Sequence, residues 1–223
     1  MADGVRTIAA STHGRYVVRP HRAAVARGLL VGFHGYGQNA VGFLDDLEQI
    51  PGVDAWQVVS IQALNRFYTK NGDVVANWMT KEDRELAIAD NVAYIAAVLV
   101  AVKKELPAPR LVYVGFSQGV AMAFRAAARA GFACDGVIAL GGDIPPELRA
   151  DASVHLPAVL IGRGIRDEWY TTDKLAADQA FLGAQGISHR IVTFDGGHEW
   201  TDSFRKAAAE FLDTRWLPPV SSR

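Results

Sequence analysis

Short apolar runs alternate with longer helical patterns along the chain, and this alternation limits the fold more than any other feature of the sequence. Strand-like runs occur at 28–33, 56–61, 111–114, 137–140, 158–161 and 189–194, with a candidate edge strand at 16–19. Helical patterns occupy 39–49, 82–106, 120–130, 175–182 and 199–216. Because most of these connections are too long for hairpins, the strands are expected to run parallel, with helices covering both faces of the sheet. The sequence therefore predicts the α/β class with a mostly parallel central sheet.

The chain is expected to fold as a single domain spanning residues 1–223. Half of its 223 residues are apolar, which is enough to bury a core without disulfides or metals. No internal repeat or low-complexity linker divides it, and loose ends are expected at 1–13 and 217–223. The longest irregular stretch, 62–80, is predicted to be functional, since long loops in compact domains usually are.

Composition argues against several classes of function. Lys and Arg total 23 against 24 Asp and Glu, a net charge of −1, so no nucleic-acid partner is expected. The lone Cys134 cannot form a disulfide within the chain, which is typical of a reducing compartment. The apolar stretch 92–102 is too short to span a membrane and the N-terminus lacks a signal-peptide pattern, so we expect a cytoplasmic protein. No histidine pair has metal-ligand spacing, and no metal or other cofactor is expected.

The motif Gly115-x-Ser117-x-Gly119 stands where a predicted strand runs into a predicted helix. At such a junction the motif describes a tight turn that lifts the serine clear of the sheet, with glycines where side chains would clash. Ser117 would then lie at a helix N-terminus, which favours developing negative charge. We therefore interpret Ser117 as a nucleophile, the alternative being an ordinary helix N-cap.

A serine nucleophile needs a base and an acid that orients the base. His198 follows the last predicted strand after two glycines that let the chain turn back over the carboxyl edge of the sheet. Asp167 follows the fifth strand, and the chain order Ser117, Asp167, His198 is that of the α/β-hydrolases. Asp143, which follows the fourth strand, is the alternative acid. We favour Asp167.

Two backbone N–H groups are candidates for an oxyanion hole. One belongs to Gln118, the residue after the nucleophile, and the other to Tyr36 in the loop after the first core strand. His34 precedes this loop, and we interpret it as a residue that pins the loop rather than as a catalytic group.

Taken together, these segments resemble the phospholipase/carboxylesterase family, the small lidless α/β-hydrolases that include acyl-protein thioesterase-like enzymes. The resemblance implies the α/β-hydrolase fold, with Ser117, Asp167 and His198 as a catalytic triad and Tyr36 and Gln118 as oxyanion donors. The chain departs from the family's usual pattern at Gln38, Val120 and Glu168. The matching segments are Phe33-His34-Gly35-Tyr36-Gly37, Gly115-Phe116-Ser117-Gln118-Gly119, Gly164-Ile165-Arg166-Asp167 and Gly197-His198-Glu199-Trp200.

The expected reaction is hydrolysis of a small carboxylic ester or thioester through an acyl-enzyme on Ser117. No lid domain is expected, because the gap from 142 to 156 is short and contains Pro145-Pro146. Short to medium acyl chains would then meet an aromatic rim, although Trp78 fits a core position equally well. The alternatives are a peptidase or amidase, and a non-catalytic ligand-binding protein of this fold. The candidate pocket residues are Phe67, Tyr68, Trp78, Trp169, Tyr170 and Trp200.

Overall fold

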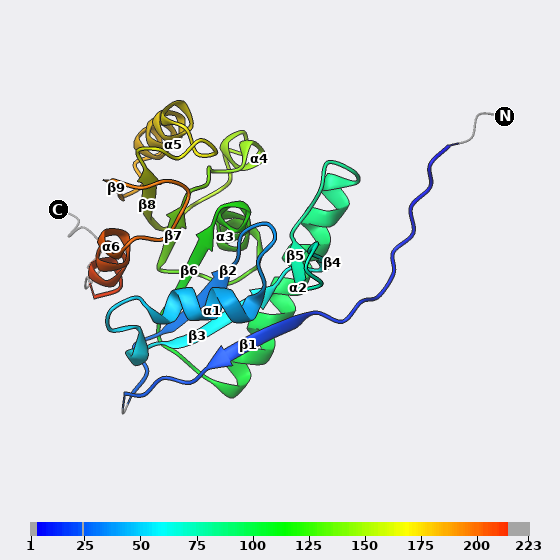
Figure 1. The fold of residues 1–223 in the computed structure, drawn as a ribbon, viewed down its shortest axis with the longest axis horizontal. Helices are drawn as coiled ribbons and strands as arrows, with labels where there is room; N and C mark the ends of the chain where they lie inside the picture. The colour runs from blue at the N-terminus through cyan, green and yellow to red at the C-terminus, as the bar shows by residue number, and fades with distance from the viewer. Residues whose placement is uncertain (1–3, 24, 214–223) are drawn as a thin grey trace.

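The computed structural model describes residues 4–23 and 25–213, which form one seven-stranded sheet, a two-stranded hairpin and the helices around them (Figure 1). The large sheet has the order β1-β3-β2-β6-β7-β8-β9. Its strands are β1 (Arg15–Arg19), β2 (Leu29–Phe33), β3 (Gln57–Gln62), β6 (Leu111–Phe116), β7 (Gly136–Leu140), β8 (Ala158–Gly164) and β9 (His189–Phe194). The helices are α1 (Ala40–Glu48), η1 (Val53–Ala55), α2 (Arg84–Glu105), α3 (Gln118–Arg129), α4 (Pro146–Arg149), α5 (Thr172–Ala184) and α6 (Asp202–Asp213).

The sheet is parallel except at its β1 edge, where β1 pairs antiparallel with β3. Its register aligns the strand ends: Phe33 pairs with Gly115, and Gly164 pairs with Phe194. The loops that leave β2, β6, β8 and β9 therefore emerge along one edge of the sheet. This arrangement confirms the predicted mostly parallel sheet, and it brings the candidate site segments to one side of the molecule.

Helices cover both faces of the sheet, as predicted, because successive strand residues point to opposite sides. On one face Leu30, Val112 and Leu160 pack with the apolar sides of α1 and α6. On the other face Val31 and Tyr113 pack with α2, α3 and α5. All residues of β2, β3, β6, β7 and β8 are buried, as expected for strands covered on both sides.

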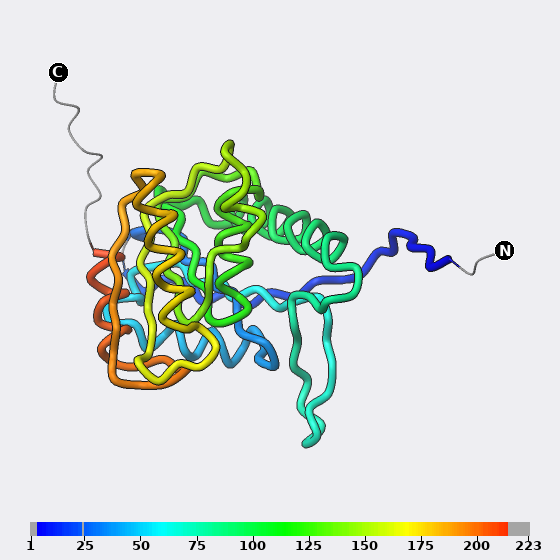
Figure 2. The backbone as a smooth tube through the Cα atoms, turned by 90° about the horizontal axis from the view of Figure 1, so that it is seen from above, coloured from blue at the N-terminus to red at the C-terminus, as the bar shows by residue number. Residues whose placement is uncertain are grey.

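The stretch 62–80, predicted from the sequence to be irregular, contains a β-hairpin instead. Strands β4 (Asn65–Tyr68) and β5 (Val74–Asn77) pair antiparallel and project from the body of the molecule (Figure 2). Most of β4 is exposed, so the hairpin lacks the apolar run that marks a core strand. It is fastened to the rest of the fold by a bridge between Ala76 and Gln38, in the loop after β2.

The chain ends and the connections carry little additional structure. Residues 4–13 form no helix or strand and lead away from the body (Figure 1), whereas 1–3 and the expected loose end 217–223 lie outside the described residues. The last three residues of the helix expected at 199–216 also lie outside them. Between β7 and β8 the only helix is the four-residue α4, and no lid is present in this part of the described chain.

Helix α2 is the one described helix that is long and apolar enough to cross a membrane by length and composition. It is longer than the apolar stretch 92–102 seen in the sequence. Within its most apolar window, 33% is buried inside the molecule, and Ile88, Ile95 and Leu99 belong to the core. The buried part of α2 packs in the core with residues of the sheet and of α3.

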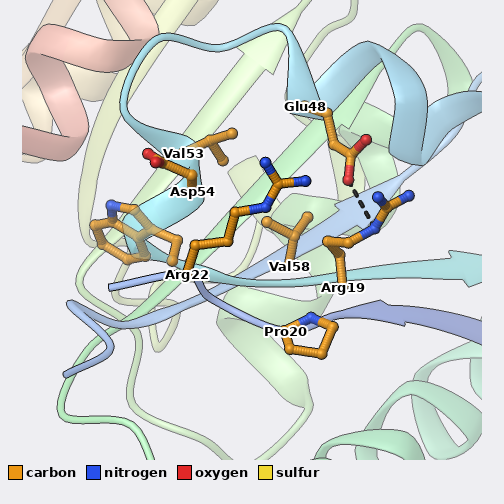
Figure 3. A pocket seen from close by; sticks show the side chains of 8 residues that line it. Arg19, Pro20, Arg22, Glu48, Val53, Asp54 and Val58 are labelled. Carbon is orange, nitrogen blue, oxygen red and sulfur yellow. Dashed lines mark ion pairs between the residues drawn. The ribbon is translucent and has the colours of Figure 1, made fainter. Parts of the chain in front are cut away.

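A cavity of about 250 Å³ lies away from the aligned strand ends, between β1, the end of α1 and the start of β3 (Figure 3). Its walls combine Val53, Val58 and Trp56 with charged groups, and Arg19 Nε pairs with Glu48 Oε1 across 2.8 Å. None of the candidate site residues lines this cavity.

Candidate active site

Ser117 occupies a strained turn between β6 and α3. Its backbone has φ 54° and ψ −121°, a conformation that L-residues adopt at a cost of about 1–3 kcal/mol. The turn is tight: a Cβ on Gly119 would lie 1.9 Å from the Phe33 carbonyl oxygen, and one on Gly115 would lie 2.5 Å from the Gly119 carbonyl oxygen. The Ser117 side chain makes no capping hydrogen bond. A nucleophile elbow has these properties, whereas an ordinary N-cap would bond to the helix.

Asp167 and His198 form the hydrogen bond expected of an acid and the base that it orients. His198 Nδ1 lies 2.8 Å from Asp167 Oδ2, with the carboxylate fully buried and the imidazole 21% exposed. The other carboxylate oxygen accepts backbone N–H groups from Trp169 and Tyr170, both at 2.9 Å. The alternative acid, Asp143, lies instead 3.5 Å from the ammonium group of Lys174.

Several contacts place the imidazole of His198 beside the elbow. The ring of Phe116, the residue before Ser117, lies 4.9 Å from the His198 ring between centroids. The two glycines after β7, Gly141 and Gly142, lie close to the His198–Asp167 pair and to Ser117. A Cβ on Gly141 would lie 2.9 Å from His198 Cε1, and one on Gly142 would lie 2.6 Å from the Ser117 carbonyl oxygen. The three candidate triad residues are therefore gathered around one pair of glycines.

The loop after β2 lies against the elbow and contains a backbone N–H without an acceptor in the described chain. A Cβ on Gly35 would lie 3.3 Å from Ser117 Cβ. Gly35 N–H donates to Gln38 Oε1 at 2.7 Å, and Gly37 N–H donates to the Ala76 carbonyl at 3.0 Å. Among the described residues nothing accepts the N–H of Tyr36, which lies between them. This free donor is suited to an oxyanion.

Two buried side chains hold this loop. His34 Nε2 accepts the Ala63 N–H at 3.0 Å, so the ring proton is on Nδ1, which donates to the Gly35 carbonyl at 2.7 Å. Burial lowers the pKa of His34 to about 4 against the opposing effect of the Gly35 hydrogen bond, so the ring is neutral near pH 7. Trp78 Nε1 donates to the His34 carbonyl at 2.8 Å. His34 therefore pins the loop, as the sequence indicated.

The sequence matches the family model for Phospholipase/Carboxylesterase over residues 14–216. The chain belongs to the phospholipase/carboxylesterase family. No curated protein sequence matches it significantly. Among solved structures, esterase PE8 is 23% identical, with 90% of this chain and 98% of that chain covered and a TM-score of 0.73.

Two further structures have the same fold. The Bacillus cereus carboxylesterase is 18% identical over 90% of this chain and 93% of that chain, with a TM-score of 0.70. Acyl-protein thioesterase 2 from Zea mays is 20% identical over 90% of this chain and 98% of that chain, with a TM-score of 0.67. These likenesses, together with the family match, confirm the α/β-hydrolase fold predicted from the resemblance.

The six aromatic residues expected at the rim separate into two groups in this family member. Trp78 and Tyr170 are fully buried, and Trp200 packs on Phe43, Phe116 and Phe204. Trp78 and Tyr170 therefore belong to the core rather than to a rim, whereas Trp200 is half-buried at the edge of the core. Trp169 is 74% exposed and Tyr68 is 75% exposed. Phe67 is half-buried and packs against Tyr36 with ring centroids 5.5 Å apart, and this contact joins the hairpin to the loop after β2.

Sequence reasoning missed the side chain of Gln118. Its Oε1 accepts the Trp78 N–H at 2.8 Å, and its Nε2 donates to the Met79 carbonyl at 2.9 Å. The amide therefore ties the elbow to the segment that follows the hairpin. Nothing local to Gln118 signals these partners, which are about 40 residues away along the chain. No cluster of metal-ligating side chains occurs within residues 4–23 and 25–213.

Proposed function

We propose that this protein is a serine hydrolase that cleaves carboxylic esters or thioesters with short to medium acyl chains. The observation that carries the proposal is the His198–Asp167 hydrogen bond beside the strained backbone of Ser117. Strain of this kind persists where the surrounding structure imposes it, most often at functional sites. Membership of a carboxylesterase family supports the same reaction class.

Each residue then has a role in a two-step acyl transfer. His198 Nδ1 faces Asp167, which leaves Nε2 to accept the Ser117 proton as Oγ attacks the carbonyl carbon. The N–H groups of Tyr36 and Gln118 hold the negative oxygen of the tetrahedral intermediate. The same imidazole returns the proton to the departing alcohol or thiol. Water then releases the acid by the reverse sequence of proton transfers.

The surroundings of the site support a small substrate. The ring pair Tyr36 and Phe67 and the exposed Trp169 offer apolar contact near the candidate triad. The described chain has no lid domain that would enclose a long acyl chain. We place the protein in the cytoplasm because its single Cys134 cannot form an internal disulfide. Burial raises the pKa of that thiol to about 12, so we assign it no role in catalysis.

Fluorophosphonate labelling tests the proposal. Wild-type protein should be labelled covalently and should hydrolyse p-nitrophenyl acetate, whereas Ser117→Ala should lose labelling and about a thousandfold or more in kcat. Ser203→Ala, at an exposed serine of α6, is the matched control and should behave as wild type. Labelling that persists in Ser117→Ala would show that another residue is the nucleophile. Folded wild-type protein that is neither labelled nor active would indicate a binding protein, and faster hydrolysis of anilides than of esters would indicate an amidase.

A further inference from the structure

Tyr170 belongs to the loop that carries the candidate acid, and both its backbone and its side chain are held by hydrogen bonds. Its N–H donates to Asp167 Oδ1 at 2.9 Å, and its carbonyl accepts Arg163 Nε at 2.7 Å. The side chain is fully buried, and its hydroxyl donates to Asp178 Oδ2 at 2.8 Å. The position of one hydrogen-bond donor to Asp167 is therefore coupled to a carboxylate on α5.

Asp178 gathers three donors from three different segments. Besides the Tyr170 hydroxyl, its Oδ1 accepts the Ile144 N–H at 3.1 Å and Arg149 Nη2 at 2.5 Å. The carboxylate is 1% exposed, which is rare for an aspartate in a helix that is mostly solvent-facing. Ile144 lies in the segment after β7 and Arg149 ends α4, so Asp178 joins the acid loop to the segment that follows β7.

Both segments touch the candidate triad. The acid loop carries Asp167 itself. Ile144 follows Gly141 and Gly142 by only a few residues, and these glycines lie against His198, Asp167 and the Ser117 carbonyl. A shift of either segment would alter the distance or angle between Asp167 and His198.

We propose that Asp178 is a positioning residue for the triad, acting through Tyr170 on the acid loop and through Ile144 on the segment after β7. The inference rests on the proposed hydrolase function and adds a residue that touches none of the reacting atoms. One donor from each of the three segments converges on this buried carboxylate, so a change at Asp178 affects all three contacts at once.

Charged groups of both signs surround Asp178. Arg149 contacts the carboxylate directly, Tyr170 donates its hydroxyl, and Asp143 adds a nearby negative charge that is itself paired with Lys174. Burial raises the pKa of Asp178 to about 6, and the Tyr170 hydrogen bond, the charge of Arg149 and the Ile144 hydrogen bond oppose that rise. Replacing the aspartate by asparagine keeps the shape of the group and removes its charge.

The test compares Asp178→Ala, Asp178→Asn and Tyr170→Phe, with Asp173→Ala in the exposed first turn of the same helix as the matched control. In Asp178→Ala we expect kcat for p-nitrophenyl acetate to fall about ten- to a hundredfold, with KM within about twofold of wild type, because the substrate site is intact while the triad is misaligned. The acid limb of the kcat/KM profile should move about half a pH unit lower, since a displaced Asp167 stabilises the imidazolium less.

The conservative variant Asp178→Asn separates a positioning role from a purely structural one. Asp178→Asn should recover most of kcat, because its amide still accepts from Ile144 and can bond to the Tyr170 oxygen. Tyr170→Phe, which removes one hydroxyl, should lower kcat about threefold to tenfold and shift the acid limb in the same direction. Folded Asp178→Ala with unchanged kcat and an unmoved acid limb would overturn the inference. If Asp178→Ala does not fold, the same absence of change in Tyr170→Phe would overturn it.

A substrate-free measurement separates this inference from the proposed function. The His198 imidazole can be titrated by NMR in wild type and in Tyr170→Phe. If wild type hydrolyses no ester, the proposed function is wrong, yet a titration midpoint that moves lower in the variant would still support positioning. An unmoved midpoint would contradict positioning even in an active enzyme.

Discussion

Trp78 Nε1 donates a hydrogen bond to the carbonyl oxygen of His34, at 2.8 Å. The same tryptophan donates its backbone N–H to Gln118 and accepts from the Asn91 amide through its carbonyl. A single buried residue thus links the loop after β2, the elbow and α2. Trp78 therefore hydrogen-bonds to the loop that contains Tyr36 and to the side chain of Gln118, the two residues that are candidate oxyanion donors.

Trp78→Phe should destabilise the protein and lower activity together. Phenylalanine leaves the His34 carbonyl without its donor and opens a small void, so we expect the free energy of unfolding to fall by about 2–4 kcal/mol. Urea unfolding measures this change, and kcat should fall because the loop that carries Tyr36 is less constrained. Tyr68→Phe, on the exposed side of the hairpin, should stay within about 0.5 kcal/mol of wild type. A variant as stable and as active as wild type would show that Trp78 does not hold the loop.

His34 should make stability depend on pH. Its folded-state pKa of about 4 lies below the ordinary 6.5, so between these values the unfolded chain binds a proton that the folded protein does not. The stabilisation is therefore complete above about pH 6.5 and is lost as pH falls toward 4, by up to about 3 kcal/mol. Asp178, whose pKa is raised to about 6, acts in the opposite direction over the same range.

The comparison that isolates His34 is the difference between wild type and His34→Gln, which has no titrating ring. Unfolding free energies at pH 7, 5.5 and 4.5 should converge as pH falls. Parallel curves for the two proteins would contradict the predicted contribution of His34.

Asp167→Asn should lose far more activity than Asp143→Asn. Asparagine keeps the shape of the side chain but favours the wrong imidazole tautomer, which lowers kcat by about 10⁴. Asp143 pairs with Lys174, so its replacement should cost less than about tenfold in kcat. Steady-state rates on p-nitrophenyl acetate measure both changes. A larger loss in Asp143→Asn would assign the acid to the segment after β7.

Acyl-chain length should limit the rate. Each buried methylene adds about 0.8 kcal/mol only while it still fits against the aromatic side chains of Tyr36, Phe67 and Trp169. We expect kcat/KM for p-nitrophenyl esters to rise over the short chains and then fall toward palmitate. The series is measured below and above the micelle concentration. A steady rise to palmitate, or a jump at the lipid interface, would reveal an acyl tunnel or a moving lid.

The fold class, and the strand ends after which Ser117, Asp167 and His198 emerge, could be predicted from the sequence. The spacing of apolar residues shows which side of a strand or helix is buried. The order of strands and helices along the chain then allows only a few sheet topologies. Ser117 was identifiable because its motif depends only on a local strand-to-helix junction. The hairpin at 65–77 was not identifiable, because its exposed β4 lacks the apolar run by which the core strands were recognised.

Which side chains meet at the end of the sheet depends on tertiary packing and could not be predicted from the sequence. Asp167 rather than Asp143 faces His198, Trp78 and Tyr170 lie in the core, and Asp178 turns inward to accept from three other segments. Spacing along α5 puts Asp178 on the same side as Leu175 and Leu182, yet it does not show what the carboxylate contacts. The direction of a side chain follows from its own element, whereas its hydrogen-bond partner depends on the packing of elements far apart in the chain.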